Sequence, residues 1–243
     1  TNYVLPSIVA AGFSGTALII ALFTLKETLS TRLKTKIQNQ STSERWLIFK
    51  NAMNKPTIRL TIILTFVSIL AFAGLEATFA LWSERVFNWG VAQNGYIFAF
   101  IGTISALIQG TMIGFLSRKI GEVGMVKQGF LALGIGLAIF PFTNNLPLLL
   151  ITLVIIAYGF SISSPALNTL LSLNVPDEQQ GSILGIGRSF STLARALGPA
   201  ISGYLFAFIG KNWPFYIGAF LMLIVLLLAL NFPNSTKETK LKN

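Results

Sequence analysis

The strongest constraint on this chain is a series of seven long apolar runs separated by polar gaps. About 20 apolar residues are needed for a helix to cross the hydrocarbon core of a bilayer, and all of the runs except the fourth reach that length. The runs are continuous and lack the alternation typical of barrel strands, which favours helices. We therefore expect an all-α membrane protein with seven transmembrane helices, over residues 3–25, 58–82, 91–116, 125–142, 146–173, 183–209 and 213–232.

Composition narrows the function classes further. Charged residues make up only 11% of the 243 residues, whereas a soluble domain carries about 25%. Cysteine and histidine are both absent, which excludes disulfides, Cys/His zinc sites and a histidine base. No phosphate-binding loop with a Gly-Lys-Ser/Thr ending occurs. We expect no metal, no cofactor and no enzymatic activity, and any pumping has to draw on an ion gradient.

The basic residues predict the orientation in the membrane. Of the 18 lysines and arginines, all but Arg85 and Lys211 lie in alternate gaps, in the adjoining parts of the runs that border those gaps, or at the C-terminal end. Cytoplasmic loops carry this excess of positive charge. The pattern places the C-terminus in the cytoplasm and Thr1 outside, and it explains the net charge of +10 without a nucleic-acid partner. Because the chain begins with Thr1 and not methionine, its start looks cut from something longer.

The long cytoplasmic gap, residues 26–56, has two parts. Residues 34–44 are polar, and we expect them to be flexible. In residues 44–56, Trp46, Phe49 and Met53 fall at helical spacing with lysines between them, which predicts an amphipathic helix that ends before Pro56. Packing beneath the helix bundle is the preferred interpretation of this helix, ahead of a separate role at the membrane interface.

Two motifs carry glycines at places where helices turn or pack. The first is GFLSRKIGE at 114–122. Its first glycine lets the helix end approach a neighbouring helix, its second permits a tight turn, and two basic residues between them lie at the membrane edge. The second, LARALGPAISGYL at 193–205, has small residues at four-residue spacing, which allow close helix packing in lipid. The motif residues are Gly114, Arg118, Lys119 and Gly121 in the first, and Gly198, Pro199 and Gly203 in the second.

In order along the chain, these motifs resemble the major facilitator superfamily, specifically its tetracycline-resistance-type branch of drug–proton antiporters. GFLSRKIGE is similar to the loop motif of that superfamily, and 193–205 is similar to its eleventh helix. Residues 74–110 resemble the seventh and eighth helices, and 5–29 resemble the sixth. The resemblance covers nearly the whole chain, as the last seven of twelve helices. One departure is Ser117, which stands where the loop motif has an aspartate, so the charge relay of that aspartate is in doubt.

The resemblance implies a domain organisation. Residues 1–25 would be the last helix of the N-terminal half, 26–56 a cytoplasmic linker, 57–233 the six-helix C-terminal half, and 234–243 a cytoplasmic tail. The partners implied are a small-molecule substrate, protons, the lipid bilayer and the missing N-terminal helices of the same transporter. Without those helices, we expect the chain to be unable to transport alone.

Two charged residues inside the apolar runs are candidates for coupling transport to protons or substrate. Glu76 is the only acid in any run, and an intramembrane acid is a functional hypothesis by default. It lies six residues before Trp82, about 9 Å from the outer interface. Arg195 is expected about 7.5 Å inside the inner edge, where it serves either as an anchor or as a gate or anion contact. A structural role for Glu76 also stays open.

Uncharged polar and aromatic residues complete the candidate site. The resemblance implies that the second and fifth spans line the central cavity. Ser163-Ser164-Pro165 is expected to interrupt the fifth helix, since broken helices mark binding sites in transporters, although a plain proline kink explains the same residues. Gln109 and Asn168 are polar at membrane depth, and bonding to a neighbouring helix is their alternative role. The cavity-lining candidates are Phe72, Phe79, Gln109, Ser163, Ser164 and Asn168.

The function expected from the resemblance is proton-coupled efflux of small lipophilic compounds by alternating access, across the plasma membrane of a bacterium (its inner membrane). One alternative is a symporter of the same fold that imports a nutrient. A seven-helix receptor is disfavoured, because no lysine lies deep within an apolar run (Lys127 is at the edge of the fourth) and there is no cysteine. A non-transporting scaffold left by gene truncation is a third alternative. The sequence does not identify the substrate or the oligomeric state.

Overall fold

The computed structural model describes residues 4–24 and 42–232, and the chain separates into two units, 1–44 and 45–243, which are treated one at a time. The first unit contains helix α1, Val4–Thr24, an apolar helix of 21 residues. At 1.5 Å per residue it is about 31 Å long, which matches the hydrocarbon core. Of the segment 34–44 predicted to be flexible, residues 34–41 lie outside the described residues, as does the tail 234–243, whereas residues 42–44 belong to a helix, contrary to the prediction.

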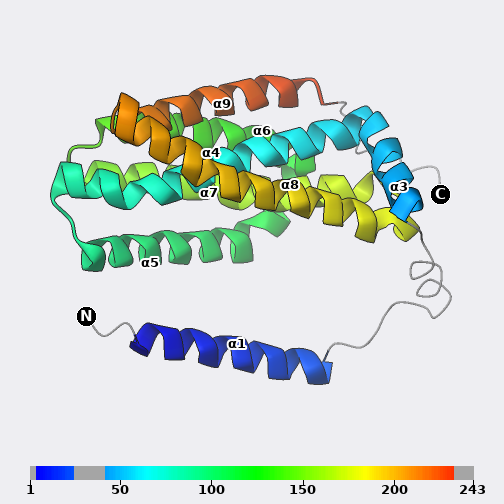
Figure 1. The fold of residues 1–243 in the computed structure, drawn as a ribbon, viewed down its shortest axis with the longest axis horizontal. Helices are drawn as coiled ribbons and strands as arrows, with labels where there is room; N and C mark the ends of the chain where they lie inside the picture. Colours follow the sequence, from blue (N-terminus) through cyan, green and yellow to red (C-terminus); the bar gives the residue numbers. More distant parts are fainter. Residues whose placement is uncertain (1–3, 25–41, 233–243) are drawn as a thin grey trace. The chain divides into compact units, whose positions relative to one another are not determined.

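The second unit is a bundle of helices, and no strand occurs in the described part of the chain (Figure 1). α6 packs against α7 and α9, and α4 packs against α8 and α9. In chain order its helices are α3 (Thr42–Asn54), α4 (Pro56–Phe87), α5 (Val91–Leu107), the π-helical η1 (Ile108–Met112), α6 (Ile113–Ile139), the 3-10 turn η2 (Phe140–Phe142), α7 (Leu146–Leu173), α8 (Asp177–Tyr204), the π-helical η3 (Leu205–Ile209) and α9 (Trp213–Leu230).

Six helices in the described ranges are long and apolar enough to cross a membrane. One of them, Val91–Phe142, contains 52 residues and would extend about 78 Å if straight. Gly121 interrupts it with a φ of 69° and a ψ of 173°, a backbone conformation that is essentially confined to glycine. The long helix is therefore two spans joined at a sharp turn, which accounts for the seven predicted runs. The predicted gap 117–124 is shorter than expected, because helix continues up to this glycine.

Two helices are longer than the apolar runs that predicted them. α4 continues five residues past Trp82 and ends at Phe87, where Asn88 takes the left-handed conformation. α8 begins at Asp177, directly after Pro176. Backbone hydrogen bonding continues through polar residues as readily as through apolar ones, so a drop in hydropathy does not mark the end of a helix.

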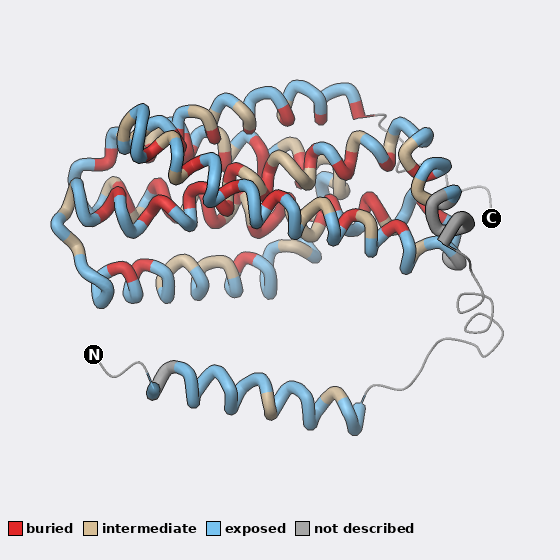
Figure 2. Tube along the Cα trace, in the orientation of Figure 1, coloured by how far each residue is buried: buried red, intermediate tan, exposed pale blue. Residues whose placement is uncertain are grey.

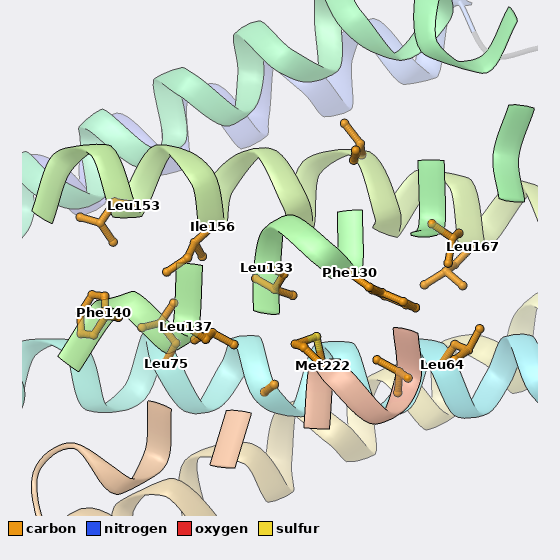
Figure 3. Packing of buried hydrophobic residues seen from close by; sticks show 14 of the residues in the cluster. Leu64, Leu75, Phe130, Leu133, Leu137, Phe140, Leu153, Ile156, Leu167 and Met222 are labelled. Carbon is orange, nitrogen blue, oxygen red and sulfur yellow. The ribbon is translucent and has the colours of Figure 1, made fainter. Parts of the chain in front are cut away.

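The core lies between α4, α6, α7 and α9, where the buried residues gather (Figure 2) and large aliphatic and aromatic side chains pack together (Figure 3). α6 and α7 approach closely because Gly129 faces Gly159: a Cβ on Gly129 would lie 2.7 Å from the carbonyl oxygen of Gly159. Such small residues allow helix backbones to touch in a membrane protein. Among the residues at the centre of the core are Leu75, Phe130, Leu133, Leu137, Leu153, Ile156 and Met222.

α3 packs against the bundle through its C-terminal end. Ala52 is buried, and Met53 packs with it against a small cluster formed by the adjoining ends of α4, α7 and α8, which includes Ile58, Leu171 and Ile183. This contact agrees with the preferred interpretation of the segment, a helix that packs beneath the bundle. The helix ends at Asn54, two residues before Pro56, as the sequence predicts.

Candidate functional site

The two charged candidates, Glu76 of α4 and Arg195 of α8, form an ion pair. Nη1 of Arg195 lies 3.5 Å from Oε2 of Glu76, and the side chains of Arg195 and Glu76 are 55% and 45% exposed, respectively. The two residues are far apart in the sequence, and nothing in its pattern pairs them. A carboxylate and a guanidinium in a membrane span each lower the cost of the other by pairing. Because about half of each side chain is exposed, the pair lies on an uncovered face of this bundle.

The pair forms because α4 and α8 run side by side in the same direction. Phe66 contacts Phe190, with ring centroids 6.4 Å apart. Further along both helices, the guanidinium of Arg85 lies 4.4 Å from the ring centroid of Phe206. The long side chain of Arg195 bridges the remaining offset along the helix axes to Glu76.

Glu76 and Arg195 both lie nearer the middle of their helices than the apolar runs indicated. Because α4 extends to Phe87, Glu76 is eleven residues from that end, about 16 Å, and not the 9 Å counted from Trp82. Arg195 lies eighteen residues after the start of α8 at Asp177. Counting from the edges of the apolar runs placed the two charges about 13 Å apart in depth, and in the bundle the remaining offset is short enough for the side chain of Arg195 to bridge.

Small residues hold α4 and α8 close together beside the ion pair. A Cβ on Gly198 would lie 2.8 Å from the carbonyl oxygen of Leu70, and one on Gly74 would lie 3.2 Å from Cβ of Ser202. Ala194, one turn before Gly198, is fully buried in the same contact. Of the small-residue motif, Gly198 is thus at the helix contact, whereas Gly203 has open space beside it.

Pro199 lies on the exposed side of α8, inside the helix. It has no N–H to donate to the carbonyl of Arg195, the residue four positions earlier. The backbone at Arg195 thus lacks one bond of the regular ladder, which makes α8 easier to bend at the charged residue.

A small cavity of about 30 Å³ adjoins Glu76. The predicted residues Phe72 and Phe79 line it, together with Phe98 and Ile101 of α5 and Leu153 and Ile156 of α7. The ring of Phe79 is buried and packs edge-on against Phe98 at 5.5 Å. One carboxylate beside several aromatic rings is an arrangement that suits a cation or a polarisable ring.

Two further phenylalanines belong to this region and were not predicted. Phe98 lines the cavity from α5, and Phe160 of α7 stacks on Phe72 with centroids 3.8 Å apart and planes 6° apart. The sequence contains 20 phenylalanines, and nothing in its pattern distinguishes these two from those that face lipid or the core.

The other predicted lining residues do not join this cavity. Ser163 is buried at the contact with α6, and its hydroxyl donates to the carbonyl of Gly159 at 2.8 Å. Ser164 is partly buried, whereas Asn168 and Gln109 are exposed at other levels of the bundle. α7 stays helical through Pro165, so the interruption predicted at 163–165 is wrong and the proline lies within a continuous helix.

The loop motif forms the turn between the third and fourth spans. Gly121 supplies the positive φ, Arg118 and Lys119 are exposed, and a Cβ on Gly114 would meet no atom within 4 Å. Ser117, which replaces the aspartate of the motif, donates its hydroxyl to Oε1 of Glu122 at 3.0 Å. A carboxylate is thus present at this turn, supplied from the other side of Gly121.

Long apolar helices, close glycine contacts and an ion pair on an uncovered face define a multi-pass helical membrane protein. A family model described as Major Facilitator Superfamily matches residues 2–199 and 112–243. The chain belongs to the Major Facilitator Superfamily, a family of membrane transporters and not of enzymes.

Similar proteins include drug-resistance proteins of bacteria. The chain is 28% identical to the tetracycline resistance protein, class E, of Escherichia coli over 214 residues, which cover 86% of this chain and 51% of that protein. It is 24% identical to multidrug resistance protein 2 of Bacillus subtilis, covering 90% of this chain and 54% of that protein. The chain thus spans about half the length of these relatives.

A solved structure of an animal transporter is also similar. It is the crystal structure of the human organic anion transporter MFSD10 (TETRAN), with a TM-score of 0.66 and 27% sequence identity. The match covers 71% of this chain and 40% of that one.

Proposed function

We propose that this chain is the C-terminal part of a transporter that exports small lipophilic compounds in exchange for protons, with Glu76 as the proton-carrying group. The ion pair between Glu76 and Arg195 carries the proposal, because it places a carboxylate in a membrane span, half exposed and beside an aromatic cavity. The similarity to tetracycline and multidrug resistance proteins supports the same function.

The chemistry of the pair explains how a proton and a substrate would exclude one another. The carboxylate of Glu76 holds one of three positive partners: the guanidinium of Arg195, a proton, or a cationic group of the substrate. When a proton binds, the carboxyl group becomes neutral, its attraction for the other two is lost, and a bound cation is released. When a cation binds, the proton leaves. This competition is the requirement for antiport.

A second candidate, import of an organic anion together with a proton, follows from the other half of the pair. An anionic substrate at Arg195 would displace Glu76, and the freed carboxylate would then take up a proton. Anion and proton would bind together, which is symport. The structural similarity to a human organic anion transporter favours this alternative.

The proposal also covers the other half of the transporter and the orientation of this chain in the membrane. The uncovered face with the ion pair would meet the N-terminal helices of the same transporter across a central cavity, and alternating access would come from rocking of the two halves. The turn at Gly121 and the C-terminus would face the cytoplasm of a bacterium, with Lys211 on the opposite side of the inner membrane.

The direction of proton movement tests the proposal. The full-length transporter is placed in everted membrane vesicles whose lumen has been acidified, and tetracycline is added as the first probe, followed by lipophilic aromatic cations and anions of matched size. Antiport predicts that cations move protons out of the lumen and raise its pH. A fall in lumenal pH with anions alone, as anion and proton enter the lumen together, would favour symport, and no response to any of these probes would contradict proton coupling.

A further inference from the structure

α5 is loosely attached to the rest of the bundle. Of its 17 residues, only Asn94 and Ile97 are buried (Figure 2). One end is held where the hydroxyl of Ser83 and the side chain of Asn94 hydrogen-bond at 2.7 Å. The other end continues through the π-helical segment Ile108–Met112. Between these attachments, α5 makes few contacts with α4 and moderate ones with α7.

A cavity of about 640 Å³ lies beneath α5, bounded by η1, α6 and α7. It is separate from the small cavity beside Glu76, with which it shares no lining residue. Its walls are aliphatic apart from Gln128 and Tyr158. Along α6 the lining extends from Gln128 to Ile135, about 10 Å.

The apolar side chains that line the cavity exclude water as its occupant. A buried water needs two to four polar partners, and an apolar cavity stays dry. Only two polar side chains, Gln128 and Tyr158, line this cavity, so most of its wall offers no partner to a water molecule. The space opens on the surface of the bundle and its lining is almost entirely apolar, so an apolar occupant fits it better than water does.

The position of the opening identifies the source of that occupant. Three lining residues, Leu107, Leu131 and Ile135, are 56%, 49% and 45% exposed, so the cavity opens on the outer surface of transmembrane helices, where bilayer hydrocarbon lies. The flexible aliphatic walls suit an alkyl chain. The phenylalanine rings, which would suit an aromatic compound, gather instead beside Glu76.

We propose that one phospholipid acyl chain occupies this cavity and holds α5 in place against α6 and α7. α5 also supplies Phe98 and Ile101 to the cavity beside Glu76. The lipid chain therefore supports the α5 wall of the candidate transport site from behind, and its loss would allow that wall to shift.

The first test measures lipid retained by the full-length transporter in mild detergent. Ala132→Phe places a ring in the cavity, because Ala132 lines it. Ala138→Phe is the matched control, on the same helix, exposed, and outside the lining. We expect the unchanged protein and Ala138→Phe to retain equal phospholipid, and Ala132→Phe to retain one molecule fewer per chain. Equal retention by all three would overturn the proposal.

The second test uses the unchanged protein, so it does not depend on the folding of a variant. A phospholipid with a photoreactive group in its acyl chain is incorporated into vesicles, and the labelled peptides are mapped. We expect labelling of residues 128–135 to exceed that of the exposed leucines Leu223 and Leu227 of α9 several-fold. Equal labelling of both surfaces would show that no lipid chain is held there, and loss of the α6 label on adding tetracycline would assign the cavity to substrate and overturn a structural role for the lipid. Neither test measures transport, so a failed coupling mechanism would leave both results unaffected.

Discussion

At the scale of single residues, Glu76 and Arg195 gain their meaning from each other. A lone charge at membrane depth costs several kcal/mol, and a paired one costs less. Their separation of 3.5 Å and their half-exposed side chains describe a contact that can open without unfolding either helix. Such a contact is suited to a group that changes partners during a transport cycle.

The first prediction concerns Glu76→Gln in the full-length transporter. The amide keeps the size of the side chain but neither binds a proton nor neutralises Arg195, so we expect gradient-driven flux to fall below about a tenth of its normal rate, as for other functional intramembrane charges. The measurement is substrate flux in vesicles at several pH values. Glu84→Gln is the control, because Glu84 is an exposed glutamate near the end of the same helix.

Melting temperatures separate this effect from misfolding. Removing one partner of an ion pair leaves the other uncompensated, whereas removing both does not. The double variant Glu76→Gln/Arg195→Gln is expected to melt above Glu76→Gln while remaining inactive. Flux in Glu76→Gln that keeps the normal rate and pH dependence would assign Glu76 a structural role.

At the scale of helices, glycine contacts decide which elements touch. Gly129 and Gly159 join α6 to α7, and Gly198 joins α8 to α4, each with a neighbouring backbone atom closer than 3.0 Å to where a Cβ would be. The remaining space is found beneath α5, where Gly102 and Gly110 have no such neighbours. Tight pairs and a loosely attached helix in one bundle are consistent with a rigid part and a movable part.

The second prediction compares two glycines of α8. Gly198→Ala would bring Cβ to 2.8 Å from the carbonyl oxygen of Leu70 and push α8 away from α4, at a cost of about 1–3 kcal/mol for overpacking. Gly203→Ala meets nothing within 4 Å and should be neutral or stabilising by up to about 1 kcal/mol, because alanine favours helix. Thermal unfolding of the full-length protein checks both, and equal melting temperatures for the two variants would contradict the close contact.

At the scale of the whole molecule, the turn at Gly121 determines how many times the chain crosses the membrane. A straight helix of 52 residues would place the basic residues Arg118 and Lys119 inside the bilayer. The turn brings them to its surface and returns the chain, so that three spans separate Lys119 from Lys211. The two lysines should then lie on opposite sides of the membrane.

The third prediction uses this separation. The chain contains no cysteine, so Lys119→Cys and Lys211→Cys each introduce a single thiol into it, with any cysteines elsewhere in the full-length protein replaced beforehand. We expect a membrane-impermeant maleimide to label Lys211→Cys in intact cells and Lys119→Cys only in everted vesicles. Labelling of both from one side would mean that the chain does not turn at Gly121, and the reverse pattern would overturn the predicted orientation.

Much of the architecture can be predicted from the sequence, because each helix is determined by the residues within its own segment. A segment of apolar residues in a bilayer has to satisfy its own backbone hydrogen bonds, so each run predicts a helix whatever its neighbours are. The turn at Gly121 can be predicted from the residue type, because few residues other than glycine adopt its backbone conformation. The boundaries of α7, Leu146–Leu173, coincide with the predicted run for the same reason.

Only the tertiary structure decides which residues meet. The pairing of Glu76 with Arg195, the burial of Ser163 and the choice of Phe98 and Phe160 among 20 phenylalanines depend on how each helix is rotated about its axis and how far it slides along its neighbour. Rotation and sliding are set by contacts between small residues far apart in the chain, such as Gly74 with Ser202. Hydropathy reports how apolar each segment is, and it carries no information about these contacts.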